Sequence, residues 1–237
     1  MSLKEALDAY AAMGYEHFEV FTSWANSAVD YHSDSRLYLK EAKERAIDFT
    51  SFHLPPISAG DLSNTLQEAV AASRFADAIG AEIAIYKATD RQTYISAART
   101  FLDAVEDLRI IPVIQNHYGT PLSSLEDVKE VFEGIADSRM RTLLEVGQFH
   151  SAGVDWREAA DYLGESIALV HIKDQIGTQS VPFGRGDIDL PGLFYYLDER
   201  SYTGRYVIEM EVTDGENTLK YLSDALTYVR RFCEDRE

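Results

Sequence analysis

Seven short apolar segments alternate with helical patterns along the chain, and this alternation constrains the fold more than any other feature. Each segment is a mostly continuous apolar run, as expected of strands buried on both faces of a parallel sheet. Helical patterns lie between them, and two of these patterns end at Gly14 and Gly80. The order therefore predicts an α/β fold built from β–α units. The predicted strands are 17–21, 48–54, 82–89, 110–117, 141–149, 167–174 and 206–212.

Seven β–α units in 237 residues favour a (β/α)8 TIM barrel. The count is one strand short, because a helical pattern begins at Ser2 and no strand pattern precedes it. Either the sequence begins after the first strand, the barrel is incomplete, or the fold is a doubly wound open sheet. No GxGxxG loop follows any predicted strand, which disfavours the open sheet. No linker-like stretch interrupts the series, so we expect one domain over residues 1–237.

Charge and composition narrow the classes of function. The net charge of −18 makes nucleic acid and anionic lipid poor partners, because both are anionic. No run of about 18 apolar residues is present, so no membrane span is expected. The N-terminal pattern is that of an amphipathic helix rather than a signal peptide. The single cysteine excludes an intramolecular disulfide. We therefore expect a soluble cytoplasmic protein.

Each predicted strand carries a polar side chain towards its C-terminal end. In a barrel these ends surround the site, and the residues that share one strand face are Glu19, His53, Lys87, Gln115, Glu145, His171 and Glu209. Carboxylates and imidazole from several strands suit one divalent cation, such as Mn²⁺, Zn²⁺, Co²⁺ or Mg²⁺. The predicted ligands are Glu145, His171 and Glu209, with Gln115 as a neutral oxygen donor. Taken singly, a histidine at a strand end is about as often a structural residue as a ligand, and a lysine there is usually solvated.

Several segments resemble the sugar isomerase/epimerase branch of the xylose isomerase-like TIM barrels, over nearly the whole chain. The branch includes tagatose/psicose epimerases and inosose-processing enzymes. GYEHFEVF resembles its Gly-Tyr-x-x-x-Glu strand, and SFHLP its Ser-x-His-x-Pro strand. LLEVGQFHSAG resembles Leu-Asp-x-Gly-His-x-x-x-x-Gly. LVHIKDQ with FGRGDID resembles His-x-Lys-Asp…Gly-x-Gly-x-Ile-Asp, and GRYVIEME matches the final strand.

The resemblance implies one divalent metal, a small sugar or polyol chelated through a carbonyl and a hydroxyl, and proton transfer next to that carbonyl. It carries Glu19, His53 and Glu209 over as site residues. Among them, Glu209 is the expected base. We predict that Lys87 and His117 take part in catalysis. The predicted substrate contacts are Glu19, His53, Gln115, His150, Arg185 and Trp24.

Three positions depart from the family pattern. Gln115 stands in place of a glutamate, Glu145 in place of an aspartate, and Gln148 in place of a histidine. An amide cannot exchange a proton as a carboxylate does, so a one-base isomerisation by Glu209 is easier to reconcile with the residues than a two-base epimerisation. A lyase or dehydratase using the same metal remains an alternative, as does a metal-free binding protein on the same fold. Family members often form dimers or tetramers, and the sequence does not fix this.

Overall fold

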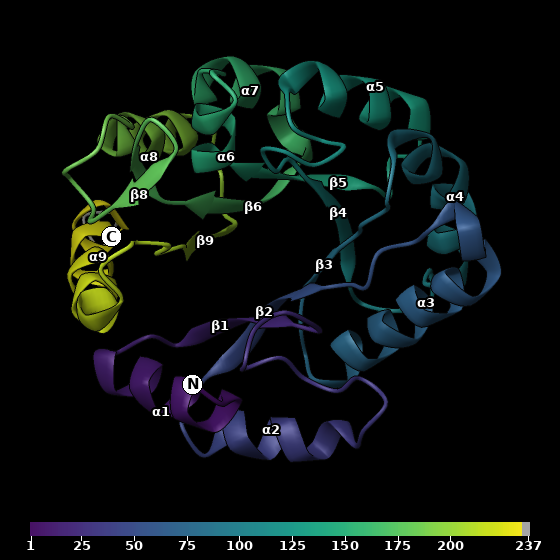
Figure 1. The fold of residues 1–237 in the computed structure, drawn as a ribbon, viewed down its shortest axis with the longest axis horizontal. Coiled ribbons are helices and arrows are strands. Elements are labelled where there is room, and N and C mark those ends of the chain that lie inside the picture. The colour runs from purple at the N-terminus through teal and green to yellow at the C-terminus, as the bar shows by residue number, and fades with distance from the viewer. Residues whose placement is uncertain (234–237) are drawn as a thin grey trace. The chain divides into compact units, whose positions relative to one another are not determined.

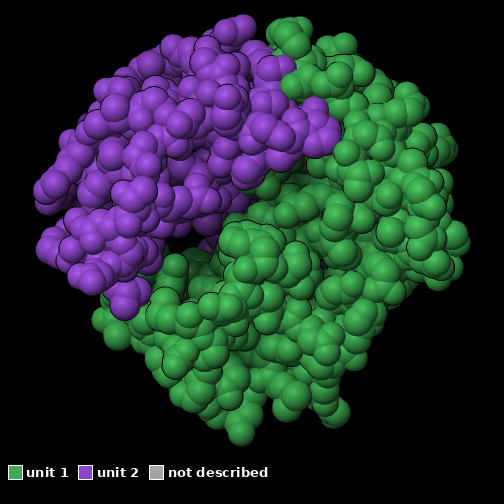
Figure 2. Space-filling model, in the orientation of Figure 1, with its two compact units in different colours: residues 1–115, 126–142 green, residues 116–125, 143–237 purple. Residues whose placement is uncertain are grey.

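The computed structural model describes residues 1–233 of the chain, which divide into two compact units (Figure 2). The first unit contains residues 1–115 and 126–142, and the second contains residues 116–125 and the described residues from 143 onwards. The prediction of a single domain over 1–237 stays a prediction. No helix of the described residues is long and apolar enough to cross a membrane.

In the first unit, parallel strands alternate with helices, and the strands pair in the order in which they occur in the chain. Helices α1 to α4 lie along one side of these strands (Figure 1). The elements are α1 (Leu3–Met13), β1 (His17–Phe21), α2 (Ser35–Lys43), β2 (Asp48–His53), η1 (Ala59–Asp61), α3 (Leu62–Ala78), β3 (Ile83–Ile85), α4 (Arg91–Ala104), β4 (Ile111–Gln115) and α5 (Leu125–Ile135).

The first helix shows how local sequence sets these boundaries. Ser2 caps α1, and Glu5 returns the bond by accepting from the Ser2 amide at 2.7 Å. The helix ends at Gly14, whose φ of 90° is the left-handed conformation that glycine adopts without strain. Buried aromatic rings then join helices to strands, as where Phe75 of α3 meets Phe52 of β2. Capping residues therefore set the two ends of α1, and aromatic packing joins α3 to β2.

In the second unit, β6 pairs in parallel with β9, and a short antiparallel hairpin, β7–β8, follows β6 directly. Strand β5 begins at the end of the first unit and finishes in the second. The elements are β5 (Arg141–Glu145), α6 (Val146–Ser151), α7 (Trp156–Leu163), η2 (Gly164–Ser166), β6 (Ile167–Ile172), β7 (Asp174–Ile176), β8 (Gln179–Val181), α8 (Leu190–Glu199), β9 (Arg205–Ile208), η3 (Gly215–Asn217) and α9 (Thr218–Cys233).

All seven predicted parallel strands are present, but several are shorter than expected. The largest error concerns 141–149, because β5 ends at Glu145 and residues 146–151 form helix α6. The carboxylate of Glu145 accepts a hydrogen bond from the Gly147 amide at 3.1 Å and so begins this helix. Strand β3 also ends early, at Ile85, so Lys87 lies in the segment that follows it.

Candidate functional sites

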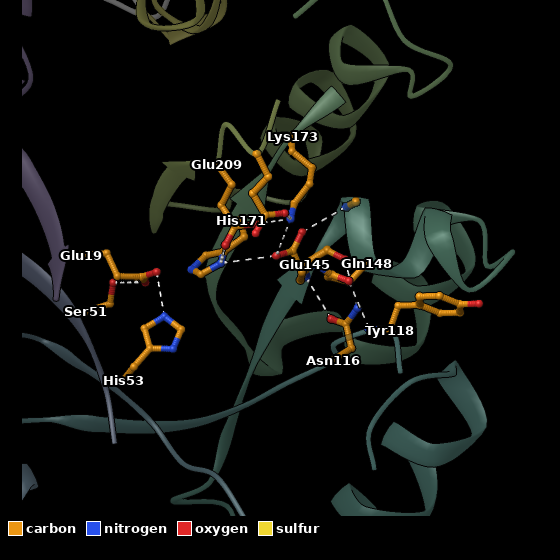
Figure 3. A network of polar contacts seen from close by, with 12 residues as sticks. Glu19, Ser51, His53, Asn116, Tyr118, Glu145, Gln148, His171, Lys173 and Glu209 are labelled. Atoms are coloured by element: carbon orange, nitrogen blue, oxygen red, sulfur yellow. Dashed lines mark hydrogen bonds and ion pairs between the residues drawn. The ribbon is translucent and has the colours of Figure 1, made fainter. Parts of the chain in front are cut away.

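Four polar side chains of the first unit form a continuous chain of contacts, which we call the Lys87 cluster. The β1–β2 register sets Glu19 opposite Ser51. One carboxylate oxygen of Glu19 accepts from Ser51 Oγ at 2.5 Å, and the other lies 2.8 Å from His53 Nε2 (Figure 3). His53 Nδ1 lies 2.7 Å from Lys87 Nζ. Three of the residues that share a strand face in the sequence pattern are therefore in contact, and Ser51 joins them.

Burial governs the protonation of this cluster. Ser51, His53 and Glu19 are buried, whereas Lys87 is partly exposed. Burial lowers the pKa of Lys87 to about 8, although the nearby Glu19 carboxylate acts to raise it. Phe21 stacks on the His53 ring with centroids 4.5 Å apart, and it also meets the ring of Trp24 at 4.6 Å. Trp24 itself is 75% exposed.

A second cluster of charged groups lies in the second unit, and we call it the Lys173 cluster. It consists of Glu145, His171, Lys173, Glu209 and Glu211. His171 Nδ1 lies 3.0 Å from Glu209 Oε1 and 3.6 Å from Glu145 Oε2. Lys173 Nζ lies 2.5 Å from Glu209 Oε2, 2.7 Å from Glu211 Oε2 and 3.9 Å from Glu145 Oε2. Figure 3 shows four of these side chains converging.

This cluster is largely closed to water. The side chains of Glu145, His171 and Lys173 are fully buried, whereas that of Glu209 is 20% exposed and that of Glu211 is 60% exposed. The buried Glu145 Oε2 has no hydrogen-bond partner among the described residues, because its nearest cationic atoms lie 3.6 and 3.9 Å away. A partnerless buried carboxylate oxygen is costly, and it is a usual mark of a missing ion or water.

The surroundings of the Lys173 cluster shift the pKa values of Glu145 and Glu209 in opposite directions. Burial and the neighbouring Glu209 raise the pKa of Glu145 to about 7, against the opposing effects of Lys173 and His171. Burial also acts to raise the pKa of Glu209, but His171 and Lys173 outweigh it and hold that pKa well below its usual range. Burial acts to lower the pKa of Lys173, and the surrounding carboxylates raise it instead.

Asn116 holds the main chain of Glu145 in place. Its side-chain amide donates to the Glu145 carbonyl at 3.0 Å and accepts from the Glu145 amide at 3.1 Å. Gln148, on the helix that Glu145 begins, accepts from the Tyr118 amide at 3.2 Å (Figure 3). Gln148 therefore fixes the segment after β4 within the second unit rather than presenting its carbonyl oxygen to the Lys173 cluster.

Four further predicted site residues make none of the contacts described above for the two clusters. Gln115 is buried at the end of β4. His117 is exposed, and its Nδ1 contacts the Tyr118 carbonyl at 3.1 Å. His150 is in the last turn of α6. Arg185 is exposed in a loop. The roles predicted for these four residues remain predictions.

Sequence reasoning missed Lys173, Ser51 and Asn116. For Lys173 a signal was present, because it is two positions after His171 and therefore on the same strand face. Glu211 is likewise two positions after Glu209. It is exposed, yet it also pairs with Lys173. For Asn116 no signal was available, since its partner is a main-chain segment 29 residues away.

Asp174 accounts for the second glycine of the motif that runs from His171 to Asp189, and the first, Gly184, has a φ of 80°. One of its carboxylate oxygens accepts from the amides of Gly184, Arg185 and Gly186 at 2.9, 3.1 and 2.8 Å. A Cβ at Gly186 would lie 2.1 Å from the other oxygen, so only glycine fits there. Asp174 therefore caps this loop.

Comparison with known proteins identifies relatives of this chain. It is 24% identical over 139 residues to the inosose dehydratase of Clostridium perfringens, and this match covers 50% of the chain and 46% of that protein. The chain thus matches less than half the length of that relative.

Solved structures share the fold. The IOLI protein with a binding zinc atom gives a TM-score of 0.81 at 14% identity, covering 98% of this chain and 94% of that one. The probable 3-DHS dehydratase AsbF of Bacillus anthracis gives 0.78 at 15% identity, with coverage of 96% and 94%. A D-tagatose 3-epimerase-like protein gives 0.79 at 16% identity, with coverage of 100% and 96%.

A family model described as "xylose isomerase-like TIM barrel" matches residues 7–232. The predicted TIM barrel class and the predicted resemblance are thereby confirmed, and the doubly wound sheet is excluded. Epimerases and dehydratases occur together among the similar proteins. The chain belongs to the xylose isomerase-like TIM barrel family.

Proposed function

We propose that this protein is an enzyme that transfers a proton next to the carbonyl of a small sugar or polyol, with one divalent metal held by Glu145, His171 and Glu209. The observation that carries the proposal is the buried Glu145 Oε2, which lies beside an imidazole and a second carboxylate but has no hydrogen-bond partner in the described part of the chain. Carboxylate oxygen and imidazole nitrogen are ligands that Mn²⁺, Zn²⁺ and Co²⁺ accept. The residues therefore fit the kind of metal that the family resemblance implies.

Charge supports a divalent ion at this position. Three carboxylates and one ammonium group give the Lys173 cluster a formal charge of about −2 when His171 is neutral and every carboxylate is ionised. A divalent cation would offset this charge. When bound, it would supply polarisation of a substrate carbonyl. Gln115 as a fourth, neutral ligand stays a prediction.

Glu209 is the proposed proton-transferring residue. Of the two buried carboxylates, its side chain is the one with an exposed fraction, and a base must be reachable by substrate. Its two oxygens contact different groups, since Oε1 lies 3.0 Å from His171 Nδ1 and Oε2 lies 2.5 Å from Lys173 Nζ. This arrangement fixes the carboxylate in one orientation. A single base of this kind suits an aldose–ketose isomerisation.

Metal binding is tested first, by elemental mass spectrometry and thermal unfolding. We expect about one equivalent of Mn, Zn or Co per chain and a higher melting temperature than in chelator-treated protein. Glu145→Gln and His171→Asn should lose both effects. Glu211→Gln is the matched control, because it removes an exposed carboxylate that also contacts Lys173. Absence of metal after incubation with each ion would favour the alternative of a metal-free binding protein.

Proton transfer is tested next, with metal-loaded protein in deuterated water and a panel of sugars and polyols. Nuclear magnetic resonance should show exchange of the proton next to the carbonyl for at least one substrate, and Glu209→Gln should abolish it while retaining the fold. A panel without any exchange, at full metal occupancy, would contradict the proposed chemistry.

A dehydratase is the second candidate, favoured by the match of 139 residues to an inosose dehydratase. Both reactions begin with loss of a proton next to a carbonyl, but a dehydratase then expels a neighbouring hydroxyl group. Mass spectrometry separates the two, since an isomerase conserves the substrate mass and a dehydratase product is lighter by one water.

A further inference from the structure

The Lys87 cluster of the first unit is not used by the proposed metal chemistry. Its four residues come from β1, β2 and the segment after β3, and each consecutive pair is within hydrogen-bond distance. Every buried polar group of the run is thus paired with a neighbour, and Lys87 reaches the Glu19 carboxylate only through His53. Here a histidine ring stands between the two charges.

The donors and acceptors of the cluster have one consistent order. The Lys87 ammonium group can only donate, so His53 Nδ1 must accept and the neutral ring must carry its proton on Nε2. Nε2 then donates to Glu19, which also accepts from Ser51. If Lys87 instead loses a proton, Nδ1 can hold it, and the resulting imidazolium remains paired with the Glu19 carboxylate. Either state satisfies every group.

Burial identifies the open end of this cluster. Ser51 is fully buried, and His53 and Glu19 are nearly so, whereas Lys87 is partly exposed. Trp24, which is exposed, contacts Phe21, and Phe21 stacks on the His53 ring. A molecule approaching from solvent therefore meets the lysine end of the cluster, and the carboxylate is reached through the histidine.

We propose that Lys87, His53 and Glu19 form a proton relay: Lys87 exchanges a proton with a bound hydroxylated molecule, and His53 Nδ1 takes up or returns the proton of Lys87. Glu19 is a positioning residue that holds the His53 ring through Nε2. The inference stands on contacts within the first unit. It uses none of the three residues proposed above as metal ligands, Glu145, His171 and Glu209. The pKa of Lys87, lowered by burial to about 8, supports it, since such an amine can both give and take a proton near neutral pH.

Protonation of Lys87 is measurable in the protein alone, by pH titration with ¹³C-labelled lysine. The chain has seven lysines, and Lys87→Met identifies the Lys87 signal by its loss. We expect a midpoint near pH 8 for Lys87. Glu19→Gln should lower this midpoint by about one pH unit, because it removes the charge that favours the ammonium form. Asp8→Asn, which removes an exposed carboxylate of the same unit, should leave it unchanged. A midpoint near that of an ordinary lysine would overturn the proposal.

A double-mutant cycle separates a relay from a simple effect of charge. His53→Asn keeps an acceptor near the position of Nδ1 but cannot reach Glu19. In a relay, Glu19→Gln should shift the Lys87 midpoint at least twofold less in the His53→Asn background than in the wild type. An equal shift in both backgrounds would mean that Glu19 acts on Lys87 through space, and it would overturn the relay.

The wild-type protein provides a test that does not depend on the folding of any variant. Below the Lys87 midpoint, ¹⁵N spectra of the imidazole should show His53 protonated on Nε2 and unprotonated on Nδ1. The opposite tautomer would overturn the proposed direction of the relay. These measurements do not require bound metal. Failure of the relay and failure of the metal proposal are therefore distinguishable.

Discussion

Lys173 is the residue on which the electrostatics of the second unit depend most. It is fully buried, and its ammonium group lies within 4 Å of three carboxylates. Removing one partner of a buried ion pair leaves an uncompensated charge, which is strongly destabilising. We expect Lys173→Met to lower the free energy of unfolding of metal-free protein by roughly 3–5 kcal/mol, measured by urea denaturation.

The matched control is Lys220→Met, which removes the same charge from an exposed pair with Asp224. Exposed pairs contribute little, about 0–1 kcal/mol. If both variants lost a similar small amount of stability, Lys173 would be solvated in solution and the buried cluster would be wrong.

Gly147 shows how closely the lysine is packed. A Cβ at this position would lie 2.2 Å from Lys173 Cγ and 2.4 Å from Cδ, so the lysine stem occupies the space that any other residue would need. We expect Gly147→Ala to lower the free energy of unfolding by roughly 1–3 kcal/mol through overpacking. Gly215→Ala is the control, because nothing lies within 4 Å of its added Cβ. Equal stability of the two variants in chemical denaturation would contradict the packing.

The pKa of Lys87 gives stability a pH dependence whose sign can be worked out. Burial lowers this pKa from 10.5 to about 8 in the folded chain. Between these values the unfolded chain binds the proton and the folded chain does not, so stability rises with pH. At pH 7 the buried ammonium costs roughly 1–3 kcal/mol. Lys87→Met should therefore be more stable than the wild type at pH 7, and this advantage should shrink as the pH approaches 10.

Thermal or urea unfolding at pH 7 and pH 9.5 measures this difference. A Lys87→Met variant that is less stable than the wild type at pH 7 would show that the hydrogen bond to His53 outweighs the cost of burial. A loss of stability from the desolvated Lys87 ammonium would be consistent with the proposed role, since active sites commonly retain strained or desolvated groups at the expense of stability.

At the scale of elements, strands were predicted better than the segments that follow them. A continuous apolar run identifies a buried strand, and all seven were found at the expected places. The run LLEVGQF was wrongly predicted as one strand, because Val146 and Phe149 are apolar although they lie in helix α6. This helix has six residues, which are too few to show a helical period in the sequence. The β7–β8 hairpin was missed for another reason: its strands have three residues each, and its turn uses Gly177 at a φ of 58°.

The loop after this hairpin depends on one side chain. Asp174 accepts from three consecutive main-chain amides, at Gly184, Arg185 and Gly186. Asp174→Ala leaves these amides without their acceptor, and we expect much faster hydrogen exchange at 184–186, with exchange in β6 unchanged. Asp187→Ala is the control, because its exposed carboxylate has no such bonds among the described residues. Unchanged exchange at 184–186 in Asp174→Ala would contradict the capping role.

At the scale of the whole molecule, the family fold could be predicted but the division into units could not. The order of strands and helices is local information, and it led to the TIM barrel class. The unit boundaries depend on contacts between distant segments: residues 116–125 belong with the second unit, whereas residues 126–142 belong with the first. The two hydrogen bonds between Asn116 and Glu145 show why, since no feature of the intervening sequence reveals them.

The net charge of −18 leads to a prediction about the entire chain. Excess charge of one sign destabilises a folded protein by self-repulsion, and salt screens this repulsion over distances of about 8–10 Å. Salt also weakens exposed ion pairs, such as that between Arg139 and Asp103, but each such pair contributes only about 0–1 kcal/mol. With 40 acidic and 22 basic residues, repulsion should dominate.

The melting temperature should therefore rise as sodium chloride is increased to several hundred millimolar, in protein treated with chelator so that metal binding does not contribute. Lys220→Met, which adds one further net negative charge at an exposed position, should show a slightly steeper rise. A melting temperature that falls with salt would mean that the exposed ion pairs contribute more to the stability of this acidic protein than its uncompensated charge removes.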